Sequence, residues 1–178
     1  MKTLLLFTFV GLILSSGCSV DNQDAGQGES PDVPTPSLNS RIYYVSTKGD
    51  DGNSAEQAKS QSTPWRTIQK AANTIVGGDT VVIMNGTYHE RVTIGERCSG
   101  KVATPTLFVA QNEGKVIIDD EHDGVSERFT SVFKIDRAKY IKIEGLKVIN
   151  SRWYGFSVEN YCDNITINKC FTYNTRAS

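Results

Sequence analysis

The sequence lacks the charge excess and the metal-ligand spacings that mark several large classes of protein. Its 178 residues contain 19 Lys and Arg against 20 Asp and Glu, a formal net charge of -1. This balance gives no basic field that would attract nucleic acid, so a nucleic-acid partner is not expected. The sequence has 2 His and 4 Cys, and no two Cys form a CxxC pair, so a zinc site is not expected either.

The sequence also lacks an apolar segment long enough to cross a membrane as a stable helix. Its apolar run at residues 4–14 is too short for that, follows Lys2 and precedes small residues and Cys18. This order is typical of an export signal over residues 1–17. The letters "LSSGC" resemble the lipobox of bacterial lipoproteins, although Ser15 stands where Leu is usual.

The lipobox resemblance implies that Cys18 is acylated and becomes the N-terminus of the exported protein. Acyl chains would anchor the protein to a bacterial membrane, at the outer membrane or the cell surface, without a spanning helix. The alternative is a plain secretory signal with an incidental Cys. Residues 18–40 contain no aromatic residue and are rich in Ser, Pro, Gly and Asp, which predicts a flexible tether. The folded region is then residues 41–178.

The folded region is expected to begin with a strand at residues 42–45 and one amphipathic helix. Thr63 and Pro64 predict the start of this helix, and Gly77-Gly78 predicts its end. One helix face would carry Trp65, Ile68, Ala72 and Ile75.

A strand pattern then recurs at intervals of about two dozen residues. The stretch "IKIEGLKVIN" at residues 141–150 and the stretch "ITINKCFTYN" at residues 165–174 share a pattern at an offset of 24 residues. The aromatics Phe108, Phe133 and Phe156, spaced by 25 and 23 residues, suggest the same period. Such a recurrence indicates a solenoid. The stacked pairs would be Ile141 with Ile165, Ile143 with Ile167, and Asn150 with Asn174, the Asn pair forming a corner ladder.

These patterns predict an all-β fold, a parallel β-helix whose first coil is covered by the helix. A β-sandwich of short strands is the alternative, but it gives no reason for the 24-residue recurrence. The segments "YYVSTKGDDGNS", "TPWRTIQKAANTIVGGDTVVIMNGTYHERV" and "YIKIEGLKVINS" resemble the N-terminal cap and first coils of bacterial right-handed parallel β-helix proteins of the pectate-lyase type. The resemblance covers residues 41–178. Because "NTRAS" ends without a capping element, the β-helix is expected to be C-terminally incomplete.

The resemblance implies cleavage of acidic, uronate-containing polysaccharides by β-elimination. In such lyases calcium neutralises the uronate carboxylate, and a Lys or Arg removes the adjacent proton. No position of this sequence matches the calcium ligands or the base of the family, so no catalytic residue is predicted. Calcium is expected in a full-length parent protein rather than in this chain.

One acidic segment has the start of a calcium-binding loop. Asp119, Glu121 and Asp123 alternate before Gly124, but Thr130 stands where such a loop needs its bidentate Glu. A solvated turn between coils is the alternative.

The segment Arg152-Trp153-Tyr154 is the candidate for contact with a sugar. A cation beside two aromatic side chains could stack a sugar ring and hold its carboxylate, although the aromatics could instead pack onto the coil. His89-Glu90-Arg91 is expected to be structural. Cys98, Cys162 and Cys170 form an odd set, so at least one stays unpaired within the chain.

Two functions remain open for the sequence. The parent protein could be a surface polysaccharide lyase of which this chain supplies the cap and early coils, without catalysis of its own. The alternative is a non-catalytic glycan-binding or structural β-helix protein.

Overall fold

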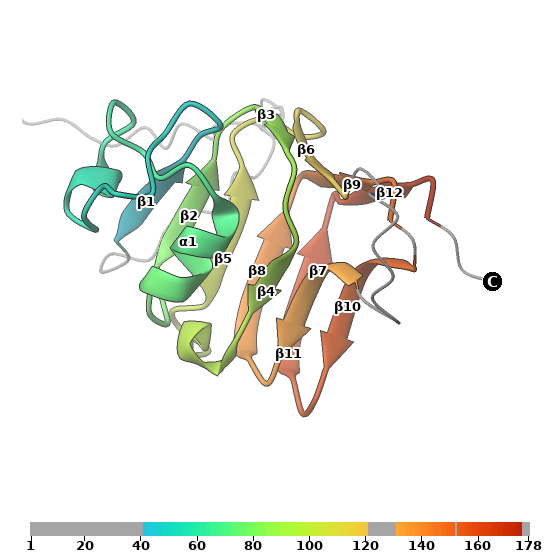
Figure 1. The fold of residues 1–178 in the computed structure, drawn as a ribbon. Coiled ribbons are helices and arrows are strands. Elements are labelled where there is room, and N and C mark those ends of the chain that lie inside the picture. The colour runs from blue at the N-terminus through green and yellow to red at the C-terminus, as the bar shows by residue number, and fades with distance from the viewer. Residues whose placement is uncertain (1–40, 121–130, 152, 176–178) are drawn as a thin grey trace, which may run out of the picture. The chain divides into compact units, whose positions relative to one another are not determined.

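The computed structural model describes residues 41–120, 131–151 and 153–175. One α-helix, α1 (Ile68–Thr74), and two short 3-10 helices, η1 (Gln57–Lys59) and η2 (Glu96–Cys98), accompany a set of short strands (Figure 1). The strands are β1 (Ile42–Val45), β2 (Thr80–Ile83), β3 (Gly86–Tyr88), β4 (Val92–Ile94), β5 (Thr106–Ala110), β6 (Val116–Asp119), β7 (Ser131–Asp136), β8 (Lys139–Glu144), β9 (Leu146–Ile149), β10 (Tyr154–Glu159), β11 (Asp163–Asn168) and β12 (Phe171–Tyr173). No helix in these ranges is long and apolar enough to cross a membrane.

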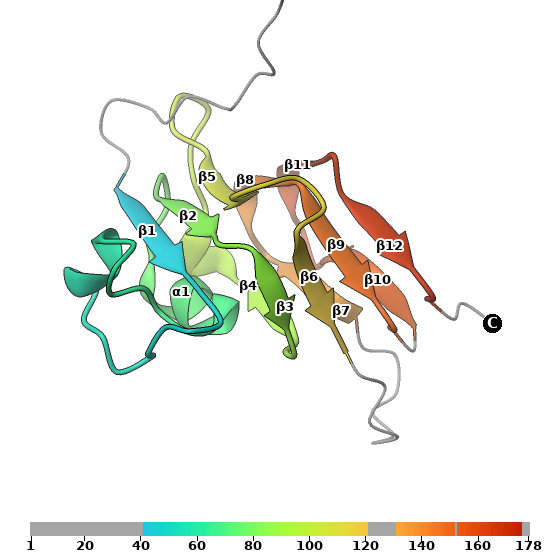
Figure 2. The ribbon, with the colours of Figure 1, turned by 90° about the horizontal axis from the view of Figure 1, so that it is seen from above.

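The strands form three parallel sheets that the chain visits in turn. Sheet A has the order β1-β2-β5-β8-β11, sheet B the order β12-β9-β6-β3 and sheet C the order β10-β7-β4. Each passage through the sheets makes one coil, and successive coils lie side by side along the axis (Figure 2). All pairings between these strands are parallel, which confirms the predicted parallel β-helix and excludes the β-sandwich, whose neighbouring strands would be antiparallel.

The predicted stacking of isoleucines is confirmed by the register of sheet A. Ile165 lies opposite Ile141, and Ile167 lies opposite Ile143. Further back along the axis, Ile143 lies opposite Phe108, which lies opposite Val81. Inward positions therefore stack apolar groups of any shape, and the pattern can persist while the letters change.

The predicted asparagine ladder is also present at the corner after sheet B. Asn174 Nδ2 donates to Asn150 Oδ1 at 2.8 Å, and Asn150 Nδ2 donates to Asp119 Oδ1 at 2.9 Å. Asn150 and Asn174 have φ values of 56° and 53°, the left-handed conformation that Asn tolerates better than most residues. The ladder joins three successive coils.

One sequence-based expectation about the coils is wrong, because Phe108, Phe133 and Phe156 do not share one position. Each complete coil of the described residues contains three strands. Phe108 lies in sheet A, whereas Phe133 and Phe156 lie opposite each other in sheet C with ring centroids 5.6 Å apart. Phe108 thus belongs to a different position in the coil, because the coils differ in length at their turns.

The helix begins later than expected. Trp65 is bridged to Val45, and its backbone N–H donates to the carbonyl of Tyr44, so this residue extends sheet A instead of entering the helix. The N-cap is Thr67, whose side chain accepts a hydrogen bond from the N–H of Lys70. Trp65 is fully buried and stacks on Tyr43 at 5.2 Å between ring centroids.

Two carboxylates hold the start of α1 against the first coil. Asp51 accepts hydrogen bonds from the N–H groups of Arg66 and Thr67, and Glu90 accepts them from the N–H groups of Ile68 and Gln69. Burial opposes ionisation of Asp51, but its hydrogen bonds from Thr67 and Arg66 outweigh burial and lower its pKa. Burial raises the pKa of Glu90 despite its two backbone hydrogen bonds. These contacts position the predicted capping helix.

Candidate functional site

The outer face of sheet A is built by the alternation of side chains along β8. Ile141 and Ile143 are fully buried and point into the coil, so Tyr140 and Lys142 point outward. The register places Thr166 of β11 opposite Lys142. Polar and aromatic side chains from successive coils thereby form rows along the axis of the β-helix.

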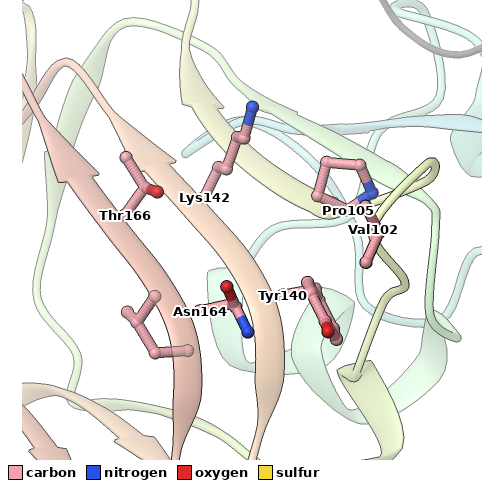
Figure 3. Close-up of a pocket in the computed structure, with 7 residues that line it drawn as sticks. Val102, Pro105, Tyr140, Lys142, Asn164 and Thr166 are labelled. Atoms are coloured by element: carbon pink, nitrogen blue, oxygen red, sulfur yellow. The ribbon is translucent and has the colours of Figure 1, made fainter.

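A groove of about 390 Å³ crosses this outer face. Tyr140 and Lys142 project from β8, Asn164 and Thr166 from β11, and the segment before β5 supplies Val102 and Pro105 (Figure 3). Among the described residues, the lining is Val102, Pro105, Tyr140, Lys142, Asn164, Ile165 and Thr166. The groove therefore combines an aromatic ring, an ammonium group, an amide and a hydroxyl.

The electrostatic character of the groove comes from Lys142. It is the one charged side chain among the described lining residues, and it is exposed. No carboxylate in the described ranges forms a salt bridge with it, whereas the nearby Glu144 lies 3.7 Å from the ammonium of Lys169. The ammonium of Lys142 is thus available to an anionic ligand.

The backbone of the groove is held in an unusual conformation. Tyr140 and Asn164 both have φ of 53°, and they stand 24 residues apart at equivalent positions of successive coils. This left-handed region costs a residue such as Tyr about 1–2 kcal/mol, so the stacked coil must hold it there. The repeated corner fixes the direction in which the Tyr140 ring leaves the coil.

The two described aromatic residues of the segment predicted to contact sugar do not line this groove. Arg152 lies outside the described residues. Trp153 is half-buried, and Tyr154, at the start of β10 in sheet C, is 52% exposed. Neither of these two aromatic residues lines the groove, and their contact with sugar stays a prediction.

The predicted calcium segment is only partly described. Asp119 ends β6 and accepts the ladder hydrogen bond from Asn150, while Glu121 and Asp123 lie outside the described residues. The next carboxylate, Asp120, binds Arg91 through two contacts of 2.7 and 3.2 Å. Within residues 41–120, 131–151 and 153–175, no three His, Cys, Asp or Glu side chains converge as metal ligands would.

The three cysteines of the folded region are all free thiols. Cys98 is fully buried, donates to the carbonyl of Ala72 at 3.2 Å, and burial raises the pKa of its thiol to about 11. Such a thiol is a packing group rather than a nucleophile. Cys170, just before β12, is half-buried.

The groove residues cannot be recognised in the sequence because they are ordinary outward positions of a strand. Tyr140, Lys142, Asn164 and Thr166 have the polar-apolar alternation of any half-buried strand. The 24-residue offset would have paired Lys142 with Thr166 and Tyr140 with Asn164, but it could not place the wall formed by Val102 and Pro105. That wall follows an irregular segment with no repeat.

Comparisons with known proteins agree with this architecture. A family model described as the Pel9A-like right-handed β-helix region matches residues 43–178. A rhamnogalacturonan lyase structure has a TM-score of 0.60 at 19% identity, covering 77% of this chain and 37% of that chain. The crystal structure of pectate lyase Pel9A has a TM-score of 0.57 at 22% identity, covering 76% of this chain and 34% of that chain.

A curated relative from Bacillus subtilis (strain 168), the uncharacterized protein YwoF, is 33% identical over 105 residues. The match covers 59% of this chain and 21% of that protein. This chain thus spans about a fifth of the curated relative and about a third of the two solved structures. With its cap, its stacked coils and the matched region, the chain belongs to the Pel9A-like right-handed β-helix family.

Proposed function

We propose that this chain forms the cap and first coils of a carbohydrate-active protein and that its groove on sheet A binds an acidic, uronate-containing polysaccharide. The observation that carries the proposal is that Lys142, which has no carboxylate partner among the described residues, lines the same groove as Tyr140. An aromatic ring can stack on the apolar face of a sugar, and an ammonium group can bind its carboxylate. Asn164 and Thr166 supply hydrogen-bonding groups for sugar hydroxyls.

The direction of the polymer follows from the stacking of the coils. Lys142 and Thr166 lie opposite each other on neighbouring strands, which in parallel sheets are about 4.7–4.9 Å apart. A linear polysaccharide lying along the β-helix axis would present successive sugar units to successive coils. Each coil would then contribute one outward side chain to each row of contacts.

The parent protein is proposed to be a polysaccharide lyase acting by β-elimination. The fold neighbours whose titles name lyases of rhamnogalacturonan and pectate support this proposal. The calcium that such a reaction uses is assigned to the parent, because the described residues of this chain provide no cluster of carboxylates for it. The chain by itself is predicted to bind polymer without cleaving it.

The second candidate function is a non-catalytic glycan-binding or structural protein of the cell surface. It is favoured by the same absence of converging carboxylates among the described residues. Unsaturated products released from polygalacturonate by the parent protein would support the lyase, and their absence would favour the binder.

Export and lipid anchoring form part of the proposal. Cys18 would carry the acyl chains, and residues 18–40 would hold the β-helix away from the membrane. The test is expression in a bacterium with labelled fatty acid. The label is expected in the wild-type chain and lost in Cys18→Ser, and an unlabelled wild-type chain would contradict the anchor.

The groove is tested by affinity electrophoresis of the purified chain in gels that contain polygalacturonate. Lys142→Met is expected to weaken retardation measurably, since the groove loses a charge-assisted contact that is worth about 1.4 kcal/mol or more. The matched control is Lys134→Met, because Lys134 points outward from sheet C, away from the groove. Equal retardation of both variants and the wild type would overturn the proposal.

A further inference from the structure

The outer face of sheet B carries two exposed aromatic side chains that the groove does not use. Phe171 and Tyr173 are 51% and 70% exposed, and they stand two residues apart on β12. Phe171 lies opposite Lys147, and Tyr173 lies opposite Ile149. In β9 the buried residues are Leu146 and Val148, so positions 147 and 149, and with them Phe171 and Tyr173, face outward.

The exposure of Phe171 and Tyr173 has a different cause from the exposure of inward residues in the last coil. Ile167 continues the inward row of Ile143 and is 39% exposed because, among the described strands, none lies beyond β11 in sheet A. A further coil would stack on the edge of β12 and cover inward groups such as Ile167. It would not cover the outer face, where Phe171 and Tyr173 point.

The outward positions of sheet B form two rows along the axis. One row contains Ile117, Lys147 and Phe171, and the other contains Asp119, Ile149 and Tyr173. Among the described residues, no carboxylate pairs with Lys147, whereas Asp119 accepts the amide hydrogen bond of Asn150. The surface therefore offers two aromatic rings, about 6.6–6.8 Å apart along the strand, together with Lys147, which forms no salt bridge with the described carboxylates.

We infer that this outer face of sheet B, defined by Ile117, Lys147, Ile149, Phe171 and Tyr173, is a second binding surface for acidic polysaccharide. Sugar rings stack on Phe171 and Tyr173, and the ammonium of Lys147 contacts a uronate carboxylate. The two aromatic rings and the ammonium of Lys147 are the groups that a uronate sugar needs, a ring to stack on and a cation for its carboxylate, whereas self-association is an outcome that the experiment below separates. The inference rests on the proposed ligand class but uses a different sheet from the groove.

The experiment is calorimetric titration of the purified chain with a short oligogalacturonide, which is too small to reach both surfaces. Two molecules are expected to bind per wild-type chain. The double variant Phe171→Ala/Tyr173→Ala is expected to bind one, and Lys142→Met is also expected to bind one, through the outer face of sheet B. Because both aromatic side chains are at least half exposed, the double variant is expected to keep its fold, which circular dichroism checks.

The matched control is Tyr161→Ala, since Tyr161 is 94% exposed at a corner outside sheet B and should leave the stoichiometry at two. If the double variant binds as many oligosaccharides as the wild type, the second surface is wrong while the groove can still stand. If Lys142→Met alone has no effect, the groove is wrong while the second surface can still stand. A wild-type dimer that the double variant dissociates would identify the surface as a self-association face and overturn the inference.

Discussion

The two ends of the described β-helix bury their inward side chains to very different extents. At the first coil, Trp65 is fully buried and Tyr43 is 4% exposed, because α1 and the preceding segment cover that end. At the last coil, Ile167 occupies an inward position and is 39% exposed, although its neighbour Ile143 is fully buried. The difference shows that an inward residue of a solenoid is buried by the neighbouring coils rather than by its own.

The largest expected effect comes from truncating the two stacked isoleucines of sheet A. Ile143→Ala is expected to lower the free energy of unfolding by about 2–5 kcal/mol, because it leaves a cavity between two coils. Ile167→Ala is expected to cost about 1 kcal/mol, because its side chain already contacts water on one side. Urea unfolding of both variants measures the difference. Equal losses would mean that the last coil is covered as well as the inner coils are.

The asparagine ladder is expected to show a smaller difference of the same kind. The side chain of Asn150 forms hydrogen bonds with both Asp119 and Asn174. The side chain of Asn174 forms a hydrogen bond with only one of the described ladder residues, Asn150. Asn150→Ala is expected to lower the free energy of unfolding by roughly 2–3 kcal/mol. Each lost hydrogen bond contributes about 1 kcal/mol, and the left-handed conformation costs Ala about 1 kcal/mol more.

The control for the ladder is Asn150→Gly, which removes the hydrogen bonds but accepts the left-handed conformation. It should be about 1 kcal/mol more stable than Asn150→Ala in the same urea titration. Asn174→Ala should lower the free energy of unfolding less than Asn150→Ala does. A larger loss of stability for Asn174→Ala than for Asn150→Ala would contradict the role given to the ladder.

The smallest expected effect lies at the covered end. Asp51→Asn is expected to destabilise the chain by about 1 kcal/mol at pH 7, because it weakens the hydrogen bonds that hold the start of α1. The pKa of Asp51 is lowered in the folded state, so its ionised form stabilises the fold above the ordinary pKa of 3.8. This contribution is lost as the pH falls through the folded-state pKa.

The difference in stability between wild type and Asp51→Asn should therefore shrink as the pH drops below about 3.8. Thermal unfolding at a series of pH values measures this difference. A difference that stays constant down to the acid limit would show that the charge of Asp51 has no part in holding the helix.

The sequence predicted the solenoid well because its inward positions are periodic. The offset of 24 residues between Ile141 and Ile165 equals the length of one coil, and the ladder of Asn150 and Asn174 follows from the same offset. The helix start was misplaced because Thr63-Pro64 is a common cap signal, whereas the tertiary bridge between Trp65 and Val45 overrides it.

The groove could not be predicted for a different reason. Lys142 and Tyr140 are outward residues of a regular strand, and their sequence pattern does not distinguish a binding face from a solvated one. The wall at Val102 and Pro105 comes from an irregular segment whose position depends on how the whole coil folds. Binding sites on a solenoid therefore depend on side chains that the repeat leaves unconstrained.

The most direct test of the account is to titrate the wild-type chain with polygalacturonate and with the same polymer after complete methyl esterification. Esterification keeps the sugar rings but removes the negative charge that Lys142 is proposed to contact. The account predicts at least tenfold tighter binding to the charged polymer, and a preference that weakens as salt is added. Equal binding to both polymers, or binding to neither, would contradict the claim that the outer face of this β-helix recognises a uronate polysaccharide.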